Sequence, residues 1–202
     1  MHVAPDEKNN AYNAGASQIA RAFSRAARTY NRYATVQGRI GQDLLQLAQN
    51  TQGRWLDAGC GTGRHTCELA QYPGNHVAGM DLSATMIEEA TIACPNGLFT
   101  VGDVHALPYN ESTFDGIFSS MALQWSHNPP DALSELARVM KPGAKAFLAI
   151  MVSGSFAELD QARRTAGLPQ TTNLMPTHCD WAAAAKFASL TVSQSNVLTY
   201  TD

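Results

Sequence analysis

Glycines at alternate positions follow an acidic residue at the end of a short apolar run. Asp57 precedes Gly59, Gly61 and Gly63, with Cys60 between the first two glycines. Glycine lets the backbone turn sharply and pass close to a ligand. A helix that begins after such a turn presents free N–H groups and a positive dipole end. Because an α/β sheet binds ligands at the carboxyl ends of its strands, this loop is predicted to mark a cofactor site.

The spacing of these glycines separates the common nucleotide cofactors. A dinucleotide fingerprint, GxGxxG counted from Gly59, requires a glycine at the position that Arg64 occupies. The loop also lacks the GK[ST] ending of a phosphate-binding loop. Asp57 places negative charge beside the glycines, which opposes a pyrophosphate but suits a cation. S-adenosylmethionine carries a sulfonium and an ammonium group, and both favour a nearby carboxylate. The loop therefore favours this cofactor, with S-adenosylhomocysteine as the product.

Two further acids end the next two apolar runs. Asp81 lies 18 residues after Gly63, where an acid accepts hydrogen bonds from ribose hydroxyls. Leu82 and Met86 are placed to give adenine an apolar face. Asp103 ends the third run and is expected to accept from the adenine amine. Three carboxylates at three successive strand ends, together with the glycine loop, form one predicted cofactor site.

The elements that must position these residues alternate between strand and helix. Five short apolar runs have strand length, and the stretches between them have helical spacing. This alternation predicts an α/β fold with a parallel sheet covered by helices on both faces. The expected strands are 54–59, 76–81, 98–103, 114–120 and 144–151, and the expected helices are 62–71, 83–93 and 131–140.

Helical periodicity also precedes the first strand. Apolar residues recur at helical spacing from Ile19 to Ala34, with Ser17 as the expected N-cap, and a second helix is expected over 37–49. After Val152 the pattern loosens. The expected elements there are a short helix at 155–166, a helix at 180–188 and a strand at 192–200.

Composition limits the class of protein. The chain has 202 residues, 45% hydrophobic and 15% charged, which suits one globular domain. A net charge of −3 disfavours nucleic-acid binding. The longest apolar run, 146–152, is far shorter than the roughly 20 residues of a membrane span. No secretory signal is evident. The spacing of the four cysteines predicts reduced thiols in a cytoplasmic protein and no metal site.

The sequence resembles the class I S-adenosylmethionine-dependent methyltransferases. Within that family it resembles most the branch of malonyl-acyl carrier protein O-methyltransferases of biotin biosynthesis. The amino-terminal stretch FSRAARTY, followed by Ala34 and Gln37, and the stretch MVSGSFAEL match that branch. The stretches that match the wider family are LDAGCGTG, GMDLS, GDVHALPY, FDGIFSSMALQW and ELARVMKPGAKAFLA.

This resemblance implies a Rossmann-like methyltransferase fold with an amino-terminal helical lid over 1–50. The cofactor-binding core is expected at 51–152 and an acceptor-side segment at 153–202. Members of the family are longer, so the carboxyl-terminal strand pair is expected to be incomplete. Tyr30 would close over the cofactor, and Phe23 would pack on the acyl group.

Four more residues complete the candidate site. Val104 and Ser119 are expected beside the cofactor. Gln124 and Trp125, which follow the fourth strand, are expected to shape the acceptor side. A malonyl carboxylate is already ionised at pH 7, so its methylation requires no catalytic general base. Catalysis would come from positioning the carboxylate and removing its water.

Arginines give an independent indication of the partner. Arg21, Arg25, Arg28 and Arg32 fall on one helical stripe, and the segment from Ala11 to Gln42 contains no acid. Such a stripe would steer an acidic acyl carrier protein, with Arg25 and Arg28 as candidate substrate contacts. A solvated helix face explains the stripe equally well.

Two alternatives to the carrier-bound acceptor stay open. One is a methyltransferase that acts on a free small molecule such as a quinone precursor. The other is a protein that binds S-adenosylmethionine without catalysis. His65, His105 and His127 receive no role from the sequence.

Overall fold

A five-stranded parallel sheet forms the centre of the protein. The computed structural model describes residues 5–169 and 175–185, with side chains from residue 15 onward. The strand order is β3-β2-β1-β4-β5, and every neighbouring pair is parallel. The predicted parallel α/β sheet is confirmed. The strands are β1 (Gly53–Ala58), β2 (Asn75–Asp81), β3 (Leu98–Val101), β4 (Phe114–Ser120) and β5 (Met140–Ala149).

The order of the strands reverses at β1, and this places the predicted site. β1 lies between β2 and β4, so Asp57 pairs with Gly79 on one side and Phe118 on the other. In parallel sheets a crevice opens outside the carboxyl ends of strands at such a reversal. Asp57 therefore lies next to the crevice.

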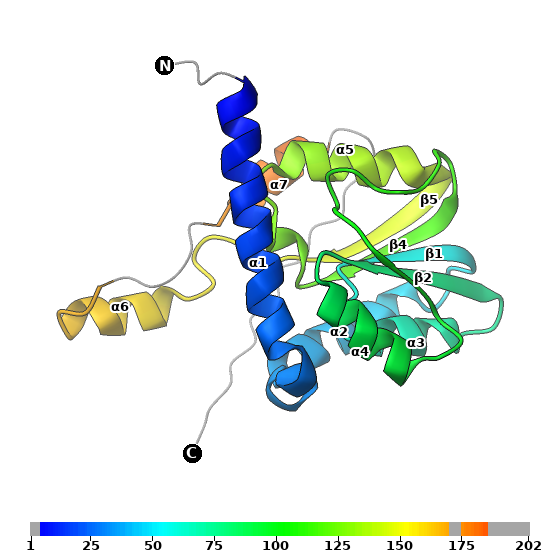
Figure 1. Ribbon diagram of the computed structural model, residues 1–202, viewed down its shortest axis with the longest axis horizontal. Helices are drawn as coiled ribbons and strands as arrows, with labels where there is room; N and C mark the ends of the chain where they lie inside the picture. The colour runs from blue at the N-terminus through cyan, green and yellow to red at the C-terminus, as the bar shows by residue number, and fades with distance from the viewer. Residues whose placement is uncertain (1–4, 170–174, 186–202) are drawn as a thin grey trace.

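Helices cover both faces of the sheet, as predicted. In Figure 1, α2 (Thr35–Ala48), α3 (Arg64–Ala70) and α4 (Ala84–Ala93) lie on one side of it, and α5 (Pro129–Val139) and α7 (His178–Ala184) lie on the other. Because successive side chains of a strand point to opposite faces of the sheet, each strand can pack against the helices on both sides.

The two faces of the sheet have separate apolar cores. Trp55 packs with Leu45 and Phe118 in one core. Its neighbour Leu56 packs with α5 and α7 in the other, where Leu136 and Trp181 are buried. The sheet is thus fixed from both sides, which holds the strand ends that carry the acids.

The long helix α1 (Pro5–Tyr33) stands beside the sheet and leads into α2 (Figure 1). The expected N-cap at Ser17 is wrong, because the helix begins at Pro5, a residue type suited to the first helical turn. The polar residues before Ile19 have no apolar period, so the sequence did not indicate this extension. Ala34 separates the two helices with φ −82° and ψ 45°.

Two of the element ends that differ from the sequence prediction have a local cause. α3 begins at Arg64, because Gly61 and Gly63 have φ of 53° and 74° and cannot continue a helix. β5 begins at Met140, before the predicted start at 144, and its register with β4 shifts there, since Phe114 pairs with Met140 but Gly116 pairs with Lys145.

The carboxyl-terminal part carries two short helices. α6 (Ala157–Thr165) projects away from the sheet and has no buried residue (Figure 1). α7 begins at His178, earlier than predicted, because Thr177 and Asp180 form a capping box. The strand expected at 192–200, and with it the incomplete strand pair, lies outside the described residues. In the described part of the chain, no helix has the length and apolar character to cross a membrane.

Candidate functional site

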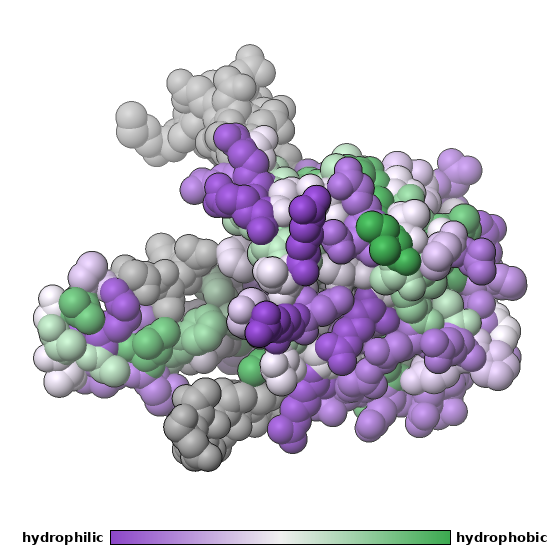
Figure 2. All heavy atoms as spheres, turned by 60° about the horizontal axis from the view of Figure 1, so that its bottom comes forward, coloured by the Kyte–Doolittle hydropathy of each residue, from purple (hydrophilic) through white to green (hydrophobic). Residues whose placement is uncertain are grey.

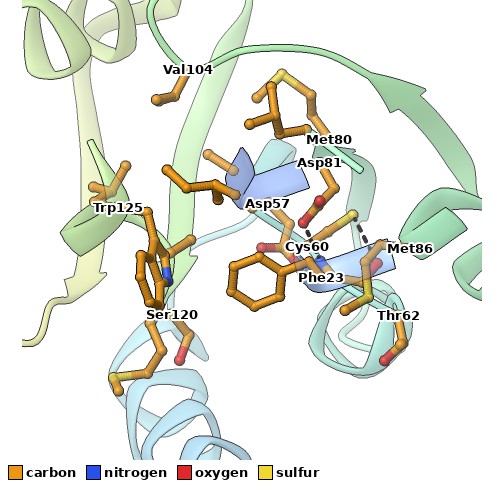
Figure 3. A pocket seen from close by; sticks show the side chains of 18 of the residues that line it. Phe23, Asp57, Cys60, Thr62, Met80, Asp81, Met86, Val104, Ser120 and Trp125 are labelled. Atoms are coloured by element: carbon orange, nitrogen blue, oxygen red, sulfur yellow. Dashed lines mark hydrogen bonds between the residues drawn. The ribbon is translucent and has the colours of Figure 1, made fainter. Parts of the chain in front are cut away.

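A cavity opens at the carboxyl ends of the strands and is bordered by α1. Figure 3 shows Ser120 and Trp125 on one side of it and Asp81, Cys60 and Met86 on the other. The structure brings most of the sequence-predicted site residues together here. Those that line the cavity are Phe23, Tyr30, Asp57, Gly59, Cys60, Gly61, Asp81, Leu82, Met86, Asp103, Val104 and Trp125.

The glycine turn is held tightly against the ends of two strands. The backbone N–H groups of Gly59 and Cys60 both donate to the Met80 carbonyl, at 2.7 and 2.9 Å. A Cβ on Gly59 would lie 2.2 Å from the Ala122 side chain. A Cβ on Gly61 would meet nothing within 4 Å, and its φ of 53° suits glycine. The turn therefore leaves open space at Gly61 for a ligand.

Asp57 lies at the bottom of this turn and is almost fully buried. It is 2% exposed, and its carboxylate accepts a hydrogen bond of 2.6 Å from the Thr66 hydroxyl. Burial raises the pKa of Asp57 to about 7, and the nearby charge of Asp81 adds to the rise. The sequence predicted an anion here. The structure shows a carboxyl group near its titration midpoint at neutral pH, which a neighbouring cation would ionise.

Asp81 ties the glycine loop to the start of α4. Its two carboxylate oxygens accept from the backbone N–H groups of Gly61 and Ser83, each at 2.9 Å. Burial raises the pKa of Asp81, and these hydrogen bonds oppose the rise. Ser83 caps α4 by accepting from the Met86 N–H. The carboxylate is thus fixed in the crevice at the end of β2.

Aromatic side chains from two elements close the cavity. The Phe23 ring lies between those of Tyr30 and Trp125, with centroid distances of 6.2 and 5.6 Å. Two hydrogen bonds hold α1 in this place. One joins the hydroxyls of Ser24 and Ser83 at 2.8 Å, and in the other the Thr62 hydroxyl donates to Asn31 Oδ1 at 2.7 Å. Burial and the charge of Asp81 raise the pKa of Tyr30, which keeps its hydroxyl neutral.

Three predicted side chains do not reach the cavity, and each has a structural contact instead. Ser119 is fully buried and donates to the Ala58 carbonyl at 2.6 Å, so it joins β4 to β1. The Gln124 amide donates to the Met121 carbonyl at 2.8 Å. Gly63 lies behind the turn, where a Cβ would come within 2.9 Å of the Ala90 side chain.

The predicted substrate contacts Arg25 and Arg28 also lie outside the cavity lining. Both are exposed and lie on the side of α1 roughly opposite the face that carries Phe23 and Tyr30. The Arg28 guanidinium lies 4.0 Å from Glu89. Hydrophilic residues predominate on the face of the molecule shown in Figure 2. Arg25 and Arg28 therefore do not contact a small molecule in the cavity.

Two polar groups in the cavity were missed by sequence reasoning. The His65 Nδ1 and Ser120 Oγ atoms are buried, and neither has a hydrogen-bond partner among the residues that the structure describes. Burial lowers the pKa of His65. An unsatisfied buried polar atom is costly unless a ligand or water completes it, so both atoms fit a polar ligand. The position of Ser120 at a strand end was a usable signal, whereas His65 carried none.

Within the part of the chain that the structure describes, no group of three or more His, Cys, Asp or Glu side chains is arranged to hold a metal ion.

Comparison with known proteins adds sequence relatives to this geometry. The profile of a family described as "Methyltransferase domain" matches residues 56–148. A relative from Erwinia billingiae, named malonyl-[acyl-carrier protein] O-methyltransferase, is 36% identical over 180 residues, which cover 89% of this chain and 71% of the relative. A relative of the same name from Pectobacterium atrosepticum is 39% identical over 160 residues, covering 78% and 63%. The chain thus spans about two thirds of their length.

Solved structures share the fold. A methyltransferase of Haloferax volcanii, solved with the activator Trm112, matches with a TM-score of 0.64 at 22% identity, over 81% of this chain and 74% of that one. A TehB-like S-adenosylmethionine-dependent methyltransferase from Corynebacterium glutamicum matches with a TM-score of 0.55 at 25% identity, over 70% and 83%.

Proposed function

The chain belongs to the class I S-adenosylmethionine-dependent methyltransferases, and we propose that its acceptor is the free carboxylate of a malonyl thioester on acyl carrier protein. The names of the Erwinia and Pectobacterium relatives support this substrate. The observation that carries the proposal is the cavity itself. Three carboxylates, a glycine turn and the aromatic side chains of Phe23, Tyr30 and Trp125 all line it.

The cofactor contacts are proposed from these positions. Asp81 would accept from the ribose hydroxyls and Asp103 from the adenine amine, while Leu82 and Met86 give the base an apolar surface. Asp57, below the turn, would stabilise the positive charge of the amino-acid end. The cofactor, when bound, supplies an electrophilic methyl group on a sulfonium.

The part of the cavity that receives the acceptor has to position the attacking carboxylate and exclude the water that surrounds it. A malonyl carboxylate is ionised at pH 7, so no residue has to take a proton from it. Phe23, Trp125 and Tyr30 cover the cavity and exclude water from the reacting groups. A carboxylate that loses its water there becomes a stronger nucleophile. Fixed alignment of the carboxylate with the methyl group lowers the activation barrier by roughly several kcal/mol.

The carrier would be bound outside the cavity. Arg21, Arg25, Arg28 and Arg32 are all exposed along α1. Positive charge on the exposed side of the helix that borders the cavity would speed the approach of an acidic carrier protein. This arrangement supports a carrier-bound acceptor over a free small molecule.

Mass spectrometry of the acceptor tests the proposal. The protein is incubated with S-adenosylmethionine and either malonyl-acyl carrier protein or a free malonyl thioester. We expect one methyl group on the malonyl carrier protein, with acetyl-acyl carrier protein as the unreactive control. Methylation of the free thioester alone would favour a small-molecule acceptor. Binding of the cofactor without methylation of either would favour a protein that is not catalytic.

A further inference from the structure

A chain of hydrogen bonds runs through His105, which has no role in the contacts proposed above. Its Nδ1 atom lies 2.8 Å from Asp103 Oδ1, and its Nε2 atom lies 2.8 Å from Ser126 Oγ. The backbone N–H of His105 donates to the same Asp103 oxygen at 2.9 Å. All three residues line the cavity. These hydrogen bonds connect the loop after β3 with the segment after the short 3-10 helix η1 (Leu123–Trp125).

The chemistry of the atoms gives the direction of each hydrogen bond. A carboxylate only accepts, so the ring nitrogen that faces Asp103 carries the hydrogen. The other ring nitrogen lies within hydrogen-bond distance of the Ser126 hydroxyl. The Ser126 oxygen in turn accepts from the Asn128 N–H at 3.2 Å. His105 is therefore fixed at both ring nitrogens.

A ring contact holds the same side chain from a third side. The centroids of His105 and His127 lie 4.4 Å apart with the rings tilted by 49°, and His127 belongs to the same segment as Ser126. Burial and the proximity of His105 lower the pKa of His127, against the opposite influence of Asp103 and Asp131.

We propose that His105 is a positioning residue that orients the Asp103 carboxylate toward the adenine amine and so sets the preference for adenine over other purines. This inference rests on the proposed function, in which Asp103 accepts from that amine. Because Asp103 is oriented before the ligand arrives, less freedom is lost on binding.

The same three side chains have the order of a Ser-His-Asp nucleophilic triad, but their surroundings fit an anchor. Ser126 is only 8% exposed, and its oxygen already accepts from the Asn128 N–H. A nucleophile needs an accessible oxygen and donors for the developing oxyanion. Ser126 therefore serves to hold the ring of His105.

Two substitutions of His105 separate its two contacts. Asn places an amide nitrogen at the position of Nδ1. His105→Asn therefore keeps a donor toward Asp103 and loses the hydrogen bond with Ser126. Gln places its amide at the position of Nε2, so His105→Gln keeps Ser126 and loses the donor toward Asp103. Calorimetry compares S-adenosylhomocysteine with S-inosylhomocysteine, which has a carbonyl oxygen in place of the adenine amine.

We expect the unaltered protein to bind S-adenosylhomocysteine about tenfold or more tightly than S-inosylhomocysteine. His105→Asn should keep this ratio, and His105→Gln should reduce it to about threefold or less. Thermal unfolding of each unliganded variant checks that it is folded. Equal weakening of both ligands by His105→Gln, or the same ratio in both variants, would overturn the role of His105.

The variant Asp103→Ala distinguishes this inference from the function on which it rests. If Asp103→Ala abolishes the preference for adenine and His105→Gln does not, the proposed role of His105 is wrong and that of Asp103 stands. If Asp103→Ala keeps the preference, Asp103 does not contact the amine, and both assignments are wrong.

Discussion

At the scale of single residues, Asp57 makes cofactor binding depend on pH. Burial raises the pKa of Asp57 to about 7, and a cation beside it favours the ionised form. We therefore expect the Kd for S-adenosylmethionine to fall as pH rises from about 6 to 8. Calorimetry over this range measures it, with Asp57→Asn as the variant in which the dependence flattens. A Kd for the unaltered protein that is independent of pH would contradict the role of Asp57.

The same residue affects stability in the opposite sense. Its folded-state pKa lies above the value of 3.8 for an unperturbed aspartate, so the folded protein binds more protons between these pH values. Its contribution to the free energy of unfolding is thus greatest at low pH and is lost as pH rises to about 7. A cationic ligand beside Asp57 stabilises its ionised form and so offsets this loss of stability.

Asp81 has the most specific proposed contact with the cofactor. We expect Asp81→Ala to weaken binding of S-adenosylhomocysteine by about 1–3 kcal/mol, through loss of charged hydrogen bonds to the ribose. Calorimetry measures the change. Asp115→Ala is the matched control, because Asp115 accepts from the Arg54 N–H and Lys141 but lies outside the cavity lining. An unchanged affinity in Asp81→Ala would remove that residue from the site.

Gly61 tests the open space in the turn. A valine there would occupy the space beside the loop and would be strained at a φ of 53°, so we expect loss of cofactor binding. Gly143→Val separates strain from occlusion, because Gly143 has a φ of 81°, has nothing within 4 Å of its Cβ position and lies in β5. Thermal shift with S-adenosylhomocysteine measures binding. Binding retained by Gly61→Val would show that the turn does not contact the ligand.

At the scale of elements, α1 is proposed to cover the acceptor in the cavity. Phe23→Ala opens the aromatic wall, so we expect the KM for the acceptor to rise about tenfold, while the Kd of the cofactor changes little. Steady-state kinetics and calorimetry measure the two values. Tyr33→Ala is the control on the same helix, because Tyr33 is 72% exposed. If both variants behave alike, α1 does not cover the acceptor.

The sequence predicted the elements whose signals are local. The glycine loop and the acids at the strand ends depend on near neighbours, and the structure places them where the sequence predicted. Ser119 does not line the cavity because the direction of a side chain at a strand end depends on register with neighbouring strands. Gln124 lies in η1, where its amide donates to the Met121 carbonyl. The hydrogen bond from Ser119 to Ala58 spans two strands, so it leaves no local signal.

At the scale of the whole molecule, charge is distributed unevenly. The chain has a net charge of −3, although its first helix carries a row of exposed arginines. Replacing Arg21, Arg25 and Arg28 by Glu should raise the KM for malonyl-acyl carrier protein about tenfold or more and leave that for a free malonyl thioester unchanged. Steady-state kinetics at low salt measure both values. The control is reversal of Arg163 and Arg164, which lie on α6 away from the cavity. Equal effects on both acceptors would contradict a docking role.

A crystal structure with S-adenosylhomocysteine tests the central claim most directly. We expect the nucleoside in the crevice beside β1, with its ribose hydroxyls on Asp81 and its amino-acid end over Asp57. A nucleoside bound elsewhere on the protein, or the same crevice filled by a nicotinamide dinucleotide in a parallel soak, would contradict the account.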